Sequence, residues 1–143
     1  MTPWTAPKSR EALRRTSVTG FVRRMAVRHP ELQGVVTFGD MLVMARRDTV
    51  IVRTATMPPG QQGRLMRIWG QAYVLLNRQQ PRAEQTIAGM HELCHFWRDD
   101  PGVPSYHSDG ETGGARDEFA DIFAWLVTSP ARVHMKGVRE EDF

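Results

Sequence analysis

The amino-acid sequence predicts an α+β fold in one domain that spans residues 1–143. The length is enough to bury a single hydrophobic core but not two. Short β-branched runs lie in the first half of the chain, and apolar segments of helical length lie in the second half. This distribution predicts an N-terminal helix, a short and mostly antiparallel sheet, and two buried helices that follow it.

The first half is predicted to begin with a helix. Residues 1–9 contain two prolines and are expected to form a mobile leader. A helix should follow from about Glu11 or Ser17 to Arg28, and Pro30 should end it. Turn residues then separate three short apolar runs, which predicts a small meander of strands. The expected strands are residues 35–38, 41–45 and 49–53.

The second half is predicted to hold one more strand and the two buried helices. Pro58, Pro59 and Gly60 break the chain between the halves. Pro81 is a favourable first-turn residue for the helix that follows it. The expected elements are a helical segment at 61–69, a strand at 71–76 closed by Asn77, helices at about 82–98 and 115–128, a Gly- and Ser-rich loop at 103–114 and a polar tail at 131–143.

The most informative motif is His91-Glu92-Leu93-Cys94-His95, which lies in an almost uninterrupted apolar run. A helix that is apolar on nearly every side is buried, so its polar residues need buried partners. Two His at i and i+4 project from one helical face, close enough to share a zinc ion. Glu92 lies beside that face and can take a proton from a water at the metal. The motif therefore predicts a Zn²⁺ site with His91 and His95 as ligands and Glu92 as the general base.

A third ligand is expected from the helix at 115–128. A hydrolytic zinc site needs three protein ligands and one open position. This helix carries Asp117, Glu118 and Asp121 among apolar residues, where carboxylates are costly unless they bind a cation or accept hydrogen bonds. Asp121 lies one turn beyond Asp117 and is suited to accept the second ring N–H of a ligating His.

These segments together resemble a known family, the ImmA/IrrE-type metallopeptidases of phages, mobile elements and bacteria. The family pattern is an HELxH helix, then E-x-x-A-[ND]-x-F-A on a second helix, then Pro. This chain has HELCH at 91–95, DEFADIFA at 117–124 and Pro130, and the resemblance covers about residues 71–130. It implies a small, gluzincin-like zincin domain with Asp117 as third ligand and Glu118 as its rival. The third ligand of the family is usually Glu, whereas this chain has Asp117. The family usually has Gly before the second His, whereas this chain has Cys94.

The resemblance implies a zinc-dependent endopeptidase that cleaves a repressor or another regulatory protein of a phage or mobile element. A second donor should stabilise the oxyanion, and Tyr106 and His107 in the Gly-rich loop are the candidates. Two alternatives remain open. One is a SprT-like, DNA-associated protease with His107 as third ligand, and the other is a non-catalytic, zinc-stabilised module that binds protein or DNA.

Charge and cysteine content suggest partners and location. Residues 1–60 carry ten Lys or Arg against four acids, whereas residues 84–143 carry five against twelve. The basic region at 8–28 could contact nucleic acid weakly, although no nucleic-acid-binding motif accompanies it. The sequence has neither a run of about 18 apolar residues nor the apolar core of a secretion signal, so no membrane partner is expected. Cys94 is the only cysteine, which agrees with a reducing cytoplasm.

Overall fold

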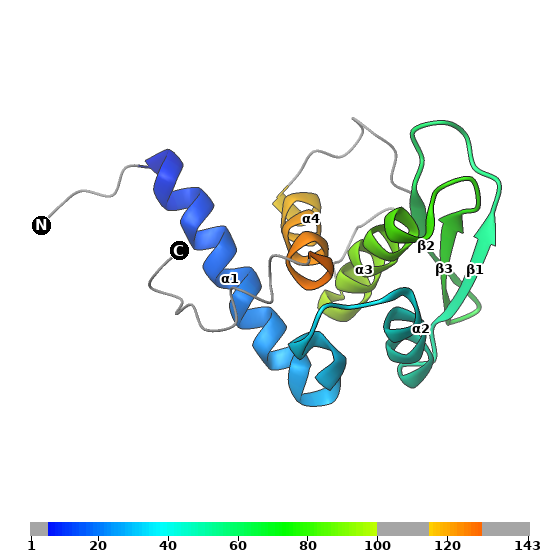
Figure 1. The fold of residues 1–143 in the computed structure, drawn as a ribbon, viewed down its shortest axis with the longest axis horizontal. Coiled ribbons are helices and arrows are strands. Elements are labelled where there is room, and N and C mark those ends of the chain that lie inside the picture. The colour runs from blue at the N-terminus through cyan, green and yellow to red at the C-terminus, as the bar shows by residue number, and fades with distance from the viewer. Residues whose placement is uncertain (1–5, 100–114, 130–143) are drawn as a thin grey trace, which may run out of the picture.

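The computed structural model describes residues 6–99 and 115–129, with side chains from residue 17 onward and, in the last helix, from residue 117. Within these ranges it has four α-helices, one short 3-10 helix and a three-stranded sheet, so the α+β class is confirmed. The layers follow one another across the molecule as α1, α4, α3 and the sheet, with α2 against α3 and β1 (Figure 1). The helices are α1 (Ala6–Arg28), α2 (Phe38–Arg47), α3 (Arg82–Arg98) and α4 (Ala115–Thr128), and the 3-10 helix η1 is Pro30–Gln33.

The sheet is mixed rather than a meander. Its strands are β1 (Ile51–Ala55), β2 (Gly63–Ile68) and β3 (Gln71–Asn77), in the order β1-β3-β2. β2 is antiparallel to β3, but β1 is parallel to it, so the expectation of a mostly antiparallel sheet is only half right. The connection after β1 carries the chain past the position of β3, and β3 then returns between its two neighbours.

The N-terminal helix is longer than the sequence predicted. α1 already includes Ala6, whereas the expected start was Glu11 or Ser17, and the expected end at Arg28 is confirmed. Residues 1–5 of the expected leader lie outside the described residues. The buried side chain of Phe21 packs edge-on against Phe119 and Phe123 of α4, with ring centroids 5.6 Å apart in both pairs. α1 therefore packs directly on the last helix of the described chain.

Two of the predicted strands, at residues 35–38 and 41–45, are wrong. The second is replaced by α2, which covers residues 38–47. Thr37 and Asp40 make a capping box, in which each side chain bonds the other residue's backbone N–H. Met41, Met44 and Ala45 are buried, which is the i, i+3, i+4 spacing of a helix packed on one face. The expected strand at 35–38 is likewise absent from the described structure, since only Phe38 belongs to an element and that element is α2.

The helical segment predicted at 61–69 is also wrong, because residues 63–68 form β2. Burial alternates along this strand, with Gly63 and Leu65 buried and Arg64 and Met66 partly exposed. A two-residue turn joins β2 to β3, and its residues Trp69 and Gly70 have φ values of 51° and 79°. Positive φ at both central residues is the requirement of a type I′ hairpin, which matches the twist of the two strands.

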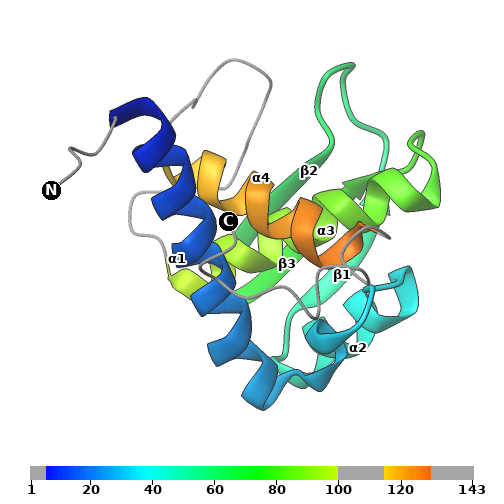
Figure 2. The same ribbon diagram turned by 60° about the vertical axis from the view of Figure 1, so that its left-hand side comes forward.

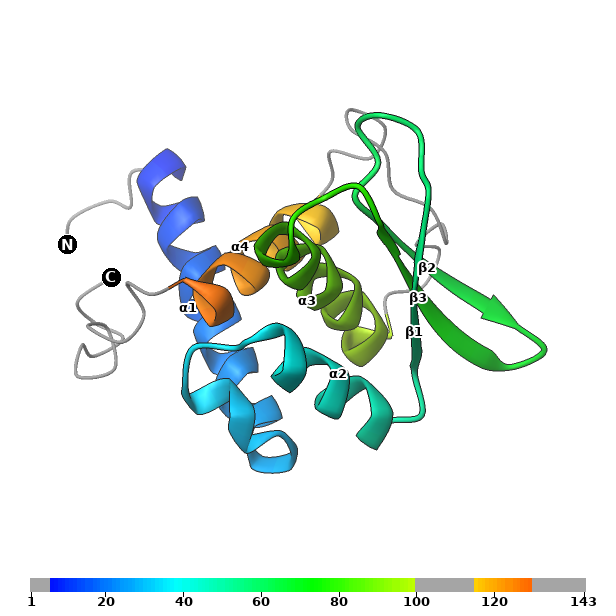
Figure 3. The ribbon, with the colours of Figure 1, turned by 45° about the vertical axis from the view of Figure 1, so that its right-hand side comes forward.

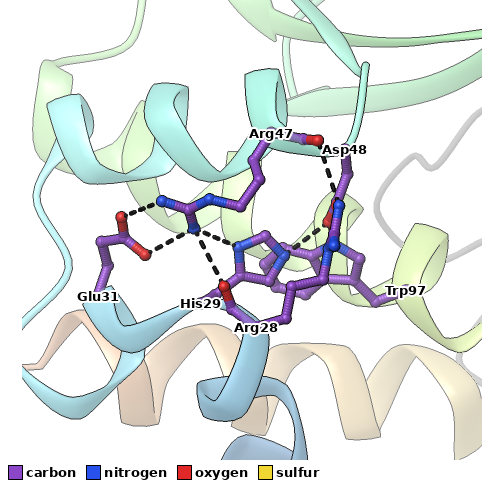
Figure 4. Close-up of polar contacts among 6 residues, drawn as sticks. All are labelled: Arg28, His29, Glu31, Arg47, Asp48 and Trp97. Atoms are coloured by element: carbon purple, nitrogen blue, oxygen red, sulfur yellow. Dashed lines mark hydrogen bonds and ion pairs between the residues drawn. The ribbon is translucent and has the colours of Figure 1, made fainter.

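A polar cluster fastens the C-terminal end of α3 to the rest of the fold (Figure 4). Asp48 follows α2 and accepts hydrogen bonds from Arg28 and from Trp97 Nε1, the latter at 2.7 Å. His29 Nε2 lies 2.6 Å from the same carboxylate, and the His29 ring stacks on Trp97. Arg47 donates hydrogen bonds to both carboxylate oxygens of Glu31, at 2.9 and 2.7 Å. We call this the Asp48 cluster; its members are Arg28, His29, Glu31, Arg47, Asp48 and Trp97.

The hydrogen bonds of the cluster fix the tautomer of its histidine. Arg47 Nη1 lies 2.8 Å from His29 Nδ1, and a guanidinium can only donate. His29 Nδ1 must therefore accept, so the ring proton is on Nε2 and is donated to Asp48. The imidazole is fully buried in this arrangement and both of its nitrogens are used.

We expect the Asp48 cluster to stabilise the fold in a pH-dependent way. Hydrogen bonds from Arg47 lower the pKa of Glu31 to about 2. Burial alone would raise the pKa of Asp48, but hydrogen bonds from Arg28, Trp97 and His29 outweigh it and hold this pKa below its ordinary value. Both carboxyl groups are more acidic in the folded state, so their stabilisation is complete above a pH of about 5 and is lost as the pH falls through the folded pKa values.

Urea unfolding at several pH values tests this expectation. Asp48→Asn should lower the free energy of unfolding by about 1–3 kcal/mol at pH 7, and the difference from wild type should shrink as the pH falls from about 5 towards 3. Glu84→Gln is the matched control, because Glu84 is an exposed carboxyl at the start of α3. An equal loss in both variants, or a loss in Asp48→Asn that does not depend on pH, would contradict the role of the cluster.

The described helices are too short or too polar to cross a membrane. None of them within residues 6–99 and 115–129 combines the length and the apolar character that a bilayer span requires.

Candidate metal centre

The motif at residues 91–95 lies on α3, which is buried between α4 and the sheet (Figure 3). The helix runs from Arg82 to Arg98, as predicted, and a left-handed residue, Asp99, caps it. Leu93 and Cys94 are fully buried, so the cysteine is a core residue. Gly89 lets α2 approach closely, since a Cβ at this position would lie 2.9 Å from the Met41 sulfur. Packing on three sides therefore fixes the direction in which the polar face of α3 points.

Helix α4 crosses α3 (Figure 2), and two histidines and one aspartate converge between the two helices. The Nε2 atoms of His91 and His95 lie 3.2 Å apart, and the two rings meet edge to face. Asp117, in the first turn of α4, places Oδ1 3.1 Å from His95 Nε2 and 3.5 Å from His91 Nε2. We call these three atoms the His-His-Asp triangle. The three residues form a group that could hold a metal ion.

The dimensions of the triangle fit a small cation. A tetrahedral ion with bonds of about 2.0–2.1 Å separates its ligand atoms by about 3.3–3.4 Å. The three edges of the triangle are 3.1, 3.2 and 3.5 Å, so they have the size of one face of such a tetrahedron. Imidazole nitrogen and carboxylate oxygen suit several first-row divalent cations, zinc among them.

Asp121 orients one of the two histidines. Its Oδ1 lies 2.8 Å from His91 Nδ1, so the ring proton on Nδ1 is directed to this carboxylate and the Nε2 lone pair faces the triangle. This is the contact that the sequence predicted for Asp121. Burial by itself would lower the pKa of His91, but the hydrogen bond to Asp121 and the charges of Glu92, Asp121 and Asp117 raise it overall.

We expect Asp121 to matter for metal affinity without being essential. Asp121→Asn keeps the shape of the side chain but removes the charge that holds the His91 ring. Zinc affinity, measured by competition with a chromogenic chelator, should fall by about 10–100-fold, as for other outer partners of metal ligands. Glu118→Gln on the exposed side of the same helix is the control and should leave the affinity unchanged. Equal affinities for Asp121→Asn and wild type would mean that the ring is held by packing alone.

Glu92 is buried beside the triangle. Its side chain is 2% exposed, and its Cγ would lie 3.4 Å from a Cβ built on Gly63, so it packs against β2. Burial raises the pKa of Glu92 to about 7; the negative charges of Asp117 and Asp121 act in the same direction, and His91 opposes them. A carboxyl group with a pKa near neutrality can both accept and release a proton at neutral pH.

The remaining candidates are not part of the triangle. Glu118 has an exposed side chain and does not belong to the group formed by His91, His95 and Asp117. Tyr106 and His107, the candidate oxyanion donors, lie outside the described residues. Sequence reasoning missed the contact of Gly63 with Glu92, for which an isolated glycine in a strand was the only available signal.

Comparisons with known proteins do not identify a family. No protein-family model matches the chain, and a search of curated proteins finds no match. The function is therefore inferred from the triangle, from Glu92 and from the resemblance of the two helix motifs.

Proposed function

We propose that this protein is a zinc-dependent endopeptidase of the ImmA/IrrE type. The observation that supports this most directly is the convergence of His91, His95 and Asp117 next to a buried glutamate. A cation held only for structure needs no buried carboxyl beside it, whereas hydrolysis needs a base at this place. The resemblance to the ImmA/IrrE-type family implies this same ligand set, in which an HExxH helix is combined with a carboxylate from the following helix.

In this proposal each residue has a defined task. His91, His95 and Asp117 hold Zn²⁺, which when bound supplies the Lewis acid that acidifies water and polarises the scissile carbonyl. Glu92 accepts the proton of the attacking water on its carboxylate and donates it to the leaving amide nitrogen. A carbon–oxygen bond forms and the peptide carbon–nitrogen bond breaks, so Glu92 ends as it began. Asp121 keeps the His91 ring in the tautomer that binds the metal.

The proposed substrate is a repressor or another regulatory protein of a phage or mobile element. The support for this class is the resemblance of residues 71–130. Tyr106 and His107 are the proposed donors to the developing oxyanion, because such a donor stabilises the transition state for peptide hydrolysis.

Incubation with candidate regulators tests the proposal. Purified protein loaded with zinc should cut a cognate repressor at one or a few sites, read by mass spectrometry of the new termini. A chelator should abolish cleavage, and added zinc should restore it. Tight binding of a regulator or of DNA without cleavage would favour the non-catalytic module instead. Cleavage only in the presence of DNA would favour the SprT-like alternative.

A further inference from the structure

One face of the sheet has no helix against it among the described residues. α2, α3 and α4 all lie on the other side (Figure 3). On β3, Ala72, Val74 and Leu76 are buried, and their partners Gly63 and Leu65 on β2 are buried as well. These residues face α3, since a Cβ on Gly63 would touch Ala88. The residues that alternate with them form the opposite face, which we call the open face.

The strand register gives the layout of the open face. Tyr73 on the central strand lies between Ile51 and Met66, and all three are partly exposed. In the next row, Leu75 lies between Arg53 and Arg64. Alternate residues of a strand are about 6.7 Å apart, so the row of the two arginines lies next to that of Tyr73, within the span of one or two nucleotides. The open face thus has an aromatic ring on its central strand and, in the adjacent row, one arginine on each outer strand.

The charge of this region has a single sign. Residues 49–83 include the whole sheet and contain five arginines, no lysine and no acid. In a chain with 16 acids among 143 residues, a stretch of this length without one is a strong local bias. A surface of this charge attracts a polyanion and repels basic proteins.

The hairpin at the end of the sheet adds a fully exposed aromatic residue to the partly exposed Tyr73. Trp69 is 101% exposed and Ile68, which precedes it on the open face, is 44% exposed. Trp69 also adopts φ 51°, a conformation that type I′ turns usually give to Asn, Asp or Gly. A large ring at this position costs stability and gains no packing in the described structure, so folding alone does not account for it.

We propose that the open face binds a single-stranded nucleic acid. Exposed aromatic rings provide stacking platforms for unpaired bases, and flanking arginines pair with the phosphates. Trp69 would stack one base at the hairpin, Tyr73 would stack another on the sheet, and Arg53 and Arg64, in the row beyond Tyr73, would contact the phosphates that follow. The charge bias argues against a second copy of this chain as occupant, because two such faces would repel each other. This surface lies on the side of the sheet opposite the His-His-Asp triangle, so the inference is independent of the proposed protease activity.

Fluorescence anisotropy with a labelled oligodeoxythymidylate of about 20 nucleotides tests the inference. The wild type should bind it more tightly than a duplex of the same length, and an oligouridylate arm reports any preference for RNA. Arg53→Gln/Arg64→Gln should weaken binding at least about tenfold and should reduce the slope of log affinity against log salt by about 1.4. Tyr73→Val should weaken binding about fivefold or more without changing that slope.

Matched variants separate the open face from general charge. Arg23→Gln/Arg46→Gln removes two exposed arginines from α1 and α2 and should change affinity less than about threefold. Trp69→Asn suits the turn and should keep the protein folded, as checked by thermal unfolding, while it weakens binding. Equal losses in the two double variants would overturn the inference, as would wild-type affinity in both Trp69→Asn and Tyr73→Val. Absence of binding by the wild type at low salt would overturn it as well.

Discussion

Replacement of Glu92 with glutamine should leave the metal bound and reduce cleavage of the cognate regulator by about 10²–10⁴-fold. Glutamine has the size of glutamate and retains hydrogen-bonding capacity, but it cannot accept the proton of water. The loss should appear in kcat rather than in KM, because the residue acts in the transition state and not in ground-state binding. Rates should be measured on a purified repressor under single-turnover conditions, with zinc content determined in the same samples.

Two controls make the Glu92 result interpretable. Glu84→Gln carries the same chemical change at an exposed position of the same helix and should cleave at the wild-type rate. Thermal unfolding of the zinc-loaded variants should show that Glu92→Gln is folded. An unchanged cleavage rate in Glu92→Gln, with one zinc per chain, would reject this residue as the base and would leave the metal centre itself intact.

Removal of a corner of the His-His-Asp triangle should abolish tight zinc binding. Asp117→Ala and His95→Ala each leave two donors, and we expect their zinc affinity to fall by more than the about 10–100-fold that loss of an outer partner costs. Since a metal ion bound at the triangle would join α3 to α4, zinc should also raise the unfolding temperature of the wild type and not of these variants. Metal analysis after dialysis and calorimetry with and without zinc are the measurements.

The neighbouring acid provides the matched control for Asp117. Glu118→Ala should bind zinc as the wild type does, because Glu118 has an exposed side chain and is not a member of the triangle. Asp117→Glu should retain zinc, since it keeps the carboxylate on the same turn of α4. If Glu118→Ala emptied the site and Asp117→Ala did not, the third donor would be displaced by one residue along the helix.

The sequence predicted the elements and contacts that depend on local spacing. α3 and α4 were predicted because their apolar runs are longer than any strand and end at clear breakers. His91 and His95 lie close together because they are one turn apart on α3. Asp121 reaches His91 because it lies one turn beyond Asp117 on α4. Asp117 was placed by the family resemblance, and its position 3.1 Å from His95 agrees with that placement.

The errors arose where a short apolar run fits two structures. Residues 41–45 are apolar enough for a strand, and only the Thr37–Asp40 capping box, read together with the burial of Met41 and Met44, distinguishes a helix. The parallel pairing of β1 with β3 joins residues 22 positions apart, as in Ile51 and Tyr73, and no local pattern encodes it. The Asp48 cluster draws on α1, η1, the end of α2 and α3, so spacing in the sequence could not reveal it.

The position of α4 between α1 and α3 has a consequence for the newly made chain. Phe21 and the other buried residues of α1 reach their α4 partners only after roughly 100 further residues have been translated, which takes about 5–20 s at ordinary elongation rates. During that interval the side of α1 that packs on α4 has no native partner. Asp117 emerges at the end of the same interval. A nascent chain therefore lacks one corner of the proposed hydrolytic centre until α4 has been made, which would delay any cleavage of neighbouring proteins to that point.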